Sequence, residues 1–335
     1  MEIGGLFWLN SINFLIWRLV RGVPPILFFS TLENFSMKKT LIALAAVAVS
    51  SAAMAQVTIT GSIGFGFESL NTAGTKTSGY GFDDSEVRFS FAEDLGGGLK
   101  ASGSMTIDNL IDGSGTTGAK GDGAVLSLSG GFGTVSFTNV GSSDYLPVDS
   151  VTTDSETFSM TTDRVTYVSP TFNGFKVTLI DADGDNAYTK ATTATEGANS
   201  IVMLDYAAGP LTANFMSQSH KNSPATTAVQ GRTGYKVGYN FGVAALTYAV
   251  LDTDRVTSAD SKETALTVSV PMGAMTASFS MADHKDVGST KLKGTQLDLS
   301  YALSKRTTIA FRNEVSDLST TTEYNQKLLT MYHSF

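Results

Sequence analysis

Cysteine is absent from this chain, and charge is scarce for its length. None of the 335 residues is a cysteine, which excludes a disulfide framework and a thiolate-bound metal. Charged residues make up 16% of the sequence, whereas soluble domains carry about 25%. No clean apolar run reaches the ~20 residues of a membrane-spanning helix, so a helical membrane bundle is excluded. The net charge of −8 disfavours a nucleic-acid partner, because phosphates would be repelled.

Glycine and aromatic residues, in contrast, are plentiful. The chain has 33 glycines, and 10% of its residues are aromatic. A hydrophobic content of 42% argues against global disorder. A β-barrel in a membrane needs few charges, because half of its strand residues face lipid. The composition therefore favours a membrane barrel over one or two soluble domains.

Residues 37–55 have the features of a secretory signal peptide. Lys38 and Lys39 supply the positive charge, residues 41–49 form a short apolar stretch, and the A-M-A sequence at 53–55 is a typical cleavage site. The apolar stretch is too short to span a bilayer. Cleavage after this site would leave a mature chain that begins at residue 56.

Residues 1–36 precede the signal and allow two interpretations. They could form a membrane anchor or an extended signal, or translation could start at Met37 and leave them as a non-native extension. A signal peptide is expected at a true N-terminus, which favours the second interpretation. The predicted organisation is therefore an extension over 1–36, a signal peptide over 37–55 and one barrel over 56–335. Removing the leader, with four basic and two acidic residues, changes the net charge from −8 to −10.

The dominant pattern of the mature chain has a period of two. Apolar and polar residues alternate strictly over 86–91, 275–281 and 296–301. This alternation places one set of side chains on each face of a β-strand. No stretch of 11 or more residues shows a convincing helical period, so the sequence predicts an all-β fold.

The connections between these strands alternate between short and long. Short turns are expected at 94–98, 130–133, 170–173, 208–210, 241–242, 271–273 and 303–305. Long polar connections are expected near 70–82, 110–121, 141–162, 184–199, 221–232, 253–262, 285–293 and 317–323. Fifteen connections join sixteen strands of about 8–13 residues, and the asymmetry between the two ends is typical of outer-membrane barrels. A soluble β-sandwich or solenoid would also alternate, but no fixed 20–50-residue repeat is present.

At five segments the chain resembles the Gram-negative trimeric general porins, particularly those of β-proteobacterial type. The segments are 93–100 (EDLGGGLK), 128–135 (LSGGFGTV), 164–170 (RVTYVSP), 301–307 (YALSKRT) and 332–335 (YHSF). The resemblance implies a 16-stranded antiparallel transmembrane β-barrel with an inward-folded third loop. It also implies a homotrimer among the lipids of the outer membrane of a Gram-negative bacterium. Two departures stand out: the third loop lacks the family's Pro-Glu-Phe-containing motif, and the arginine cluster of the pore wall is thin.

The two faces of the predicted strands have different side chains. A barrel of sixteen strands is too wide to be filled by its own side chains, so an aqueous channel is expected. The polar set should line the channel: Thr58, Thr60, Ser62, Ser90, Ser102, Ser104, Thr178, Ser278, Ser280 and Ser300. The apolar set should face lipid: Val87, Phe89, Phe91, Val177, Leu179, Leu246, Phe279, Leu297, Leu299 and Phe311.

Charged residues of the third long connection and of the wall are the candidate site. The connection 141–162 and its exit carry Asp144, Asp149, Asp154, Glu156 and Asp163. Alternation turns a set of bases toward the pore: Arg88, Lys100, Arg164, Lys176, Lys236, Arg306 and Arg312. Acids on the loop facing bases on the wall would select ions at a constriction. Alternatively, the acids are a solvated surface and the bases are scattered. Phe335, a terminal aromatic residue on the last strand, is the expected signal for insertion into the outer membrane.

These features predict a general diffusion porin for the passive passage of ions and small hydrophilic solutes. A substrate-specific channel and a structural or adhesive surface barrel stay open as alternatives. An enzyme is not expected, because the three histidines of the chain accompany no G-x-S-x-G elbow. No cofactor and no metal are expected either, since the acidic cluster at 181–185 does not complete an EF-hand pattern. The choice between anions and cations stays open: the acidic loop favours cations, and the wall bases favour anions.

Overall fold

The computed structural model describes most of the mature chain. The described residues are 56–108, 110, 119–140, 146, 163–182, 198–221, 229–256, 258–289, 291–319 and 322–335. The predicted extension over 1–36 and the predicted signal peptide over 37–55 lie outside them. Within the described residues, no helix is long and apolar enough to cross a membrane.

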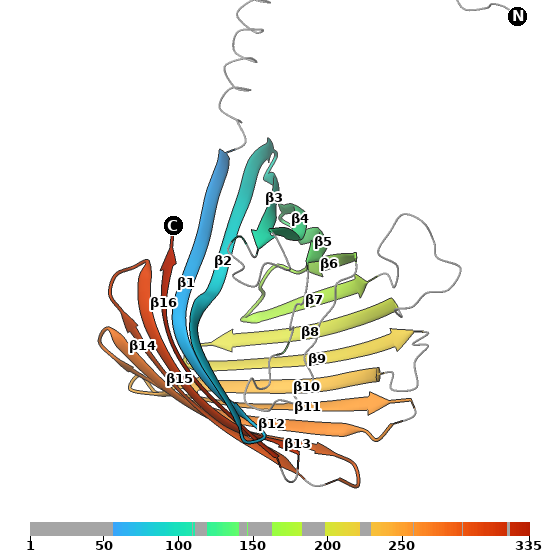
Figure 1. The fold of residues 1–335 in the computed structure, drawn as a ribbon. Helices are drawn as coiled ribbons and strands as arrows, with labels where there is room; N and C mark the ends of the chain where they lie inside the picture. The colour runs from blue at the N-terminus through green and yellow to red at the C-terminus, as the bar shows by residue number, and fades with distance from the viewer. Residues whose placement is uncertain are drawn as a thin grey trace, which may run out of the picture. The chain divides into compact units, whose positions relative to one another are not determined.

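Sixteen antiparallel strands close into one barrel, as the alternation and the turns predict (Figure 1). Each strand pairs with its neighbours in the sequence, and β1 pairs with β16. The strands are β1 (Gln56–Thr72), β2 (Thr75–Gly96), β3 (Leu99–Asp108), β4 (Lys120–Gly130), β5 (Gly133–Val140), β6 (Arg164–Val168), β7 (Phe175–Ala182), β8 (Ala198–Ala208), β9 (Leu211–Lys221), β10 (Val229–Asn240), β11 (Ala245–Arg255), β12 (Ser261–Met272), β13 (Met275–Asp286), β14 (Leu292–Ala302), β15 (Thr307–Ser319) and β16 (Thr322–Ser334).

The strand registers align the apolar side chains into continuous rows on the outer face. Leu246, Val268, Phe279 and Leu297 are opposite one another on four successive strands, and all four are exposed. Exposed apolar rows of this kind suit a surface that faces lipid. All ten residues that the sequence assigns to lipid belong to this face of their strands.

Hydroxyl side chains on the opposite face form the inner wall. Ser269 and Ser278 are hydrogen-bonded at 2.9 Å, Thr267 and Ser280 at 2.9 Å, and Ser127 and Ser136 at 2.8 Å. Each pair spans two neighbouring strands, so the hydroxyls satisfy one another across the wall. The ten residues predicted to line the channel share this inner face by register.

Two of the predicted long connections are in fact tight. β1 continues to Thr72, and β2 begins at Thr75. Only Ala73 and Gly74 therefore form the turn, where the sequence predicts a loop over 70–82. Their φ angles of 54° and 84° are those that a two-residue type I′ hairpin requires. Likewise, β15 ends at Ser319 and β16 begins at Thr322, so both strands extend into the predicted connection 317–323. The Gly, Asn and Asp residues of these segments have weak strand propensity, but pairing with neighbouring strands outweighs it.

The two ends of the barrel chain meet at the short-turn end. Gly61 donates its backbone N–H to Phe335 O at 3.1 Å, and Phe335 donates to Gly61 O at 2.9 Å. The Phe335 ring lies against the α-carbon of Gly61, because a Cβ built there would be 2.5 Å from Phe335 Cζ. This contact joins the last residue of the chain to the first strand and completes the closure.

Candidate functional site in the barrel lumen

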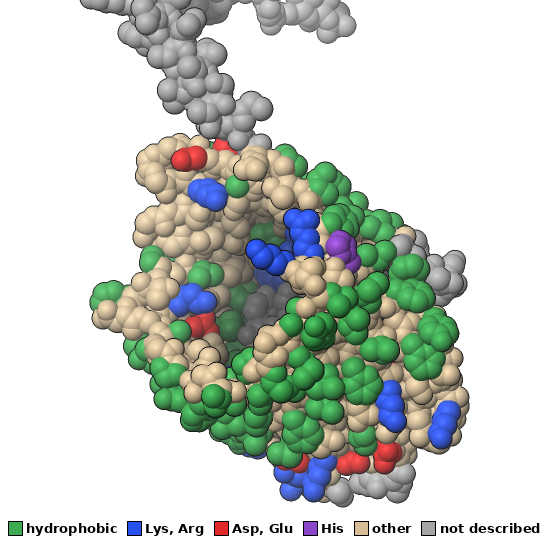
Figure 2. Space-filling model, turned by 90° about the vertical axis from the view of Figure 1, so that its left-hand side faces the viewer, with side chains coloured by type: hydrophobic (Ala, Val, Ile, Leu, Met, Phe, Trp, Pro, Cys, Tyr) green, Lys and Arg blue, Asp and Glu red, His purple; other side chains and the backbone are tan. Residues whose placement is uncertain are grey.

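The inner wall surrounds a hollow. Sixteen strands make a barrel whose interior exceeds the reach of its own side chains. Figure 2 shows this hollow from one end, with Lys and Arg side chains at its edge and hydrophobic side chains around the outside. The charged residues of the inner wall are therefore the candidate functional groups.

Arg88 and Lys100 lie on the inner face of neighbouring strands. Arg88, on β2, donates from Nε to the hydroxyl of Thr106 on β3 at 3.2 Å. Lys100, on β3, is exposed beside the turn at Gly97-Gly98. Both positions agree with the alternation in the sequence, and Lys100 is closer to the short-turn end of the barrel than Arg88 is.

Three further predicted bases lie on β6, β7 and β10. Arg164, at the start of β6, is 6% exposed. Lys176 forms an ion pair with Asp205 of β8 at 3.1 Å, and the same carboxylate accepts a hydrogen bond from Asn214 at 2.6 Å. Lys236 lies opposite Asn214, so it is close to this group. The register therefore places Lys236 on the same inner face as the Lys176–Asp205 ion pair, one strand beyond Asn214.

Arg312 and Arg306 have different environments. Arg312, on β15, donates from Nε to Asp298 Oδ1 of β14 at 2.9 Å, and Gln296 donates to the other carboxylate oxygen. Arg306 was predicted to lie on the wall, but it lies in the turn between β14 and β15 and is exposed. The turn includes Arg306 because Ser304 Oγ accepts hydrogen bonds from the backbone N–H groups of Arg306 and Thr307, and β15 begins only at Thr307.

The acids of the third long connection divide into two groups. Asp144, Asp149, Asp154 and Glu156 lie outside the described residues. Asp163 differs from the expectation, because its carboxylate accepts a hydrogen bond from Asn139 Nδ2 at 2.6 Å. Asn139 shares the outer face of β5 with Phe137, so this bond holds Asp163 at the outer edge of the wall.

Leu146, from the same connection, is one of two inner-wall residues that the sequence pattern does not indicate. It is 4% exposed and belongs to a buried cluster of inward-facing apolar side chains on β7 to β13. The other members of the cluster are Ile180, Ala182, Ile201, Met216, Ala249, Leu251, Ala265 and Ala282. A Cβ added to Gly234 on β10 would collide with Leu146 Cδ2. Leu146 is therefore packed against the inner wall.

Arg232 is a second missed residue and lies beside this cluster. It was assigned to a loop over 221–232, but β10 begins at Val229 and places Arg232 on the inner face. Its guanidinium donates to Gln218 Oε1 at 3.5 Å, and Arg232 is 8% exposed. Arg164 and Arg232 are thus buried on the side of the barrel that Leu146 covers, whereas Arg88 is only partly buried.

The opposite side of the lumen is acidic. In the closed order of sixteen strands, β16 is eight strands from β8, so the wall of β14 to β2 faces the wall of β6 to β10. Six acidic and two basic described residues share the inner face there by register: Glu68, Asp84, Glu86, Asp94, Asp298, Glu314, Arg88 and Arg312. A basic wall therefore faces an acidic wall across the lumen.

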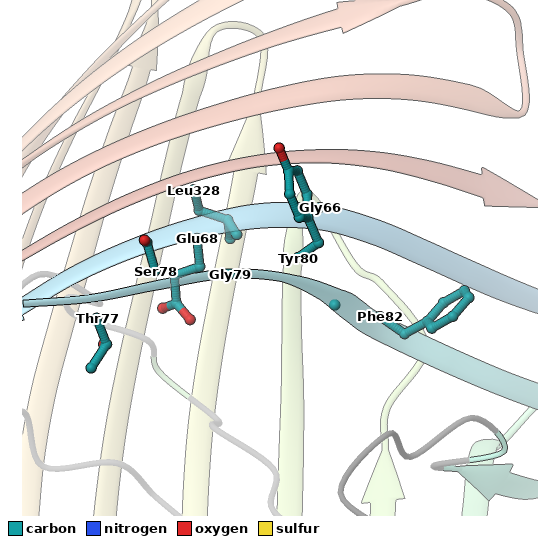
Figure 3. A pocket seen from close by; sticks show the side chains of 9 residues that line it. Gly66, Glu68, Thr77, Ser78, Gly79, Tyr80, Phe82 and Leu328 are labelled. Atoms are coloured by element: carbon teal, nitrogen blue, oxygen red, sulfur yellow. The ribbon is translucent and has the colours of Figure 1, made fainter.

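A small recess lies in this acidic wall. Its volume is about 260 Å³, and it is lined by residues of β1, β2 and β16 (Figure 3). The lining includes Gly66, Glu68, Thr77, Gly79, Gly81 and Leu328. Among the described residues, no group of three or more His, Asp or Glu side chains is placed to bind a metal.

The model of the family described as Gram-negative porin matches residues 40–317 of the chain. The chain belongs to the Gram-negative porin family. A closed 16-stranded barrel with an apolar outer face and a polar hollow interior is the architecture that this family needs for its function.

Curated relatives and solved structures agree with this assignment. Outer membrane porin protein 32 of Delftia acidovorans is 30% identical over 316 residues, covering 82% of this chain and 88% of the relative. Major outer membrane protein P.IB of Neisseria lactamica is 27% identical over 320 residues, covering 81% and 91%. The anion-selective porin from Comamonas acidovorans has a TM-score of 0.65 at 21% identity, covering 84% of this chain and 100% of that one. An engineered variant of the Rh. blastica porin has a TM-score of 0.64 at 13% identity with the same coverage.

This porin is an outer-membrane protein of a Gram-negative bacterium and forms a water-filled channel for passive diffusion of ions and small hydrophilic solutes. The predictions of fold, membrane and function are confirmed. Its family and fold are those of a channel rather than an enzyme.

Proposed function

We propose that this porin is a general diffusion channel whose lumen is narrowed by the connection 141–162, folded inward. The observation that carries the proposal is the position of Leu146, 4% exposed among inward-facing residues of β7 to β13. A residue between β5 and β6 can reach that wall only if its connection enters the lumen. The open part of the channel would then lie between this loop and the wall of β14 to β3.

The charges of the constriction follow from this position. The loop acids Asp144, Asp149, Asp154 and Glu156 would face the bases that remain accessible across the lumen. Arg88 is the best candidate, since it is only partly buried and Arg312 is already bound to Asp298. Arg164 and Arg232 are buried on the wall that the loop covers. They would therefore bind the loop and would not contact the passing solute. Charges that face a narrow aqueous path act as the selectivity filter.

Planar-bilayer recording tests the channel and the role of Arg88 together. The wild-type protein is expected to give ohmic conductance in steps grouped in threes, because we propose a homotrimer surrounded by outer-membrane lipids. Arg88→Ser removes a pore-facing positive charge, so the reversal potential in a tenfold KCl gradient should shift toward cation selectivity. Lys305→Ser, in an exposed turn at the barrel end, is the matched control and should leave it unchanged. A folded protein without conductance would refute the channel, and an unshifted potential in Arg88→Ser would refute the role of Arg88.

The remaining parts of the proposal concern the two ends of the chain and the lack of catalysis. We propose that residues 37–55 are removed as a signal peptide, that 1–36 are a non-native extension, and that Phe335 is the insertion signal. The mass of the protein purified from outer membranes should correspond to 56–335. We further propose that the porin catalyses no reaction and needs no cofactor or metal.

A further inference from the structure

The recess in the inner wall of β1 and β2 lies in the half of the barrel away from the termini. Glu68 is near the hairpin turn at Ala73-Gly74, and its side chain belongs to the inner face. The recess exists because Gly79 and Gly81 carry no side chain on that face: a Cβ at either position would meet nothing within 4 Å. Glycine within a strand weakens the strand and often marks a close approach of a ligand.

The polar groups around the recess have free acceptor capacity. Gln326 Nε2 donates to Glu68 Oε1 at 2.5 Å and fixes the carboxylate. Among the described residues, no cation forms an ion pair with Glu68. Thr330 Oγ1 lies 2.6 Å from the Cβ position of Gly66, which lines the recess. Thr330 is 1% exposed, and its hydroxyl has no hydrogen-bond partner within the part of the chain that the structure describes. Thr330 is not among the residues that line the recess, so the groups available to an occupant are Glu68 and the hydroxyls of the hairpin.

The electrostatic environment decides which ligand fits. Of the described residues that line the recess, Glu68 is the only charged one. The surrounding inner wall has six described acids against two bases, and one of those bases, Arg312, is already bound to Asp298. Figure 3 shows the side chains of Glu68 and Thr77 pointing to the same side of the β1–β2 ribbon. A carboxylate, a hydroxyl and net negative charge around a small cavity suit an ammonium group, which carries only donors.

We propose that this recess is a binding subsite for small solutes with an ammonium group, which it holds at the mouth of the channel before they cross the constriction. Glu68 forms a charge-assisted hydrogen bond with the ammonium group, Thr77 accepts a second one, and the space over Gly79 and Gly81 takes the aliphatic part. The subsite rests on the proposed diffusion channel and adds a preference among the solutes that pass.

Single-channel recording with 1,5-diaminopentane tests the subsite, with 1,5-pentanediol as the uncharged probe of similar size. At low ionic strength the diamine is expected to reduce the wild-type current in a saturable manner, and the diol is not. Glu68→Gln should weaken the block by about tenfold, the size expected for loss of one charge-assisted hydrogen bond. Gly79→Val fills the recess without changing charge and should weaken the block as well. Glu323→Gln, an exposed residue near the same end of β16, is the matched control and should leave the block unchanged.

Each outcome distinguishes the subsite from the channel itself. If the wild type conducts KCl but the diamine and the diol act alike, the subsite is refuted and the channel stands. If Glu68→Gln weakens the block but Gly79→Val does not, the charge acts at a distance and the recess is not the site. If the wild type does not conduct at all, the diffusion channel on which the subsite rests is refuted.

Discussion

Leu146→Asp is expected to raise the single-channel conductance by about 1.5- to 3-fold, because the narrowest cross-section of a pore limits its current. Leu146 is buried among apolar side chains of the inner wall. Losing a buried leucine side chain costs about 2–5 kcal/mol, and a buried unpaired carboxylate adds to that cost. Since about 1.4 kcal/mol is a factor of ten in an equilibrium constant, the attached position of the loop would become a minor state.

Two companion variants make this result specific. Leu146→Met conserves volume and should cost less than about 1.5 kcal/mol, so its conductance should stay close to that of the wild type. Gly234→Val disrupts the same contact through the barrel wall, because a Cβ at residue 234 would collide with Leu146 Cδ2. It should raise the conductance as Leu146→Asp does. An unchanged conductance in both Leu146→Asp and Gly234→Val, with the barrel folded, would contradict the inward position of the loop.

The sequence contained enough to predict the barrel because the membrane imposes a simple rule on each strand. A strand between lipid and water must alternate, and the alternation is visible wherever both faces carry side chains, as at Phe89 and Ser90. The inner position of Arg88 and Arg312 follows from the same rule. The position of Arg306 was predicted wrongly because this residue lies just outside a strand, where side chains do not alternate between the two faces.

The parts that could not be predicted depend on glycine or on distant contacts. On β10 the inner face reads Arg232, Gly234, Lys236, Gly238 and Asn240, so two of these five inner positions have no side chain to reveal the period. Leu146 looks like an isolated apolar residue in a polar loop. Its burial depends on strands up to about 135 residues later in the chain, such as the one with Ala282, and no local pattern contains that information. The recess beside Glu68 likewise needs the register that brings Gly79 and Gly81 next to β1.

Gly61→Val is expected to prevent closure of the barrel, with a loss of folded protein of about tenfold or more. A Cβ at residue 61 would be 2.5 Å from the backbone oxygen of Glu86 and 2.5 Å from Phe335 Cζ. The Glu86 oxygen belongs to the β2 ladder and cannot move without breaking it. Overpacking of this kind costs about 1–3 kcal/mol where side chains can yield and more where backbone must move. The folded fraction can be measured from the heat-dependent mobility of the protein on gels after refolding in detergent.

The control separates this collision from the general cost of valine in place of glycine. Gly121→Val places the same side chain on β4, where a Cβ would meet nothing within 4 Å. It should fold to nearly the yield of the wild type. Equal yields for Gly61→Val and the wild type would show that β1 and β16 close the barrel without the close approach of Gly61 and Phe335.

Phe335→Ala distinguishes the two roles proposed for Phe335, which are closure of the barrel and the signal for insertion into the outer membrane. This substitution removes the ring but leaves the two backbone hydrogen bonds between Gly61 and Phe335, at 3.1 and 2.9 Å, able to form. Because those bonds hold the last strand in register, refolding of the purified variant in detergent should reach a yield close to that of the wild type. In cells, the variant should accumulate in the outer membrane far less than the wild type if the ring is the insertion signal. Equal losses in detergent and in cells would assign the ring to packing against Gly61 instead, and no loss in either would remove Phe335 from both roles.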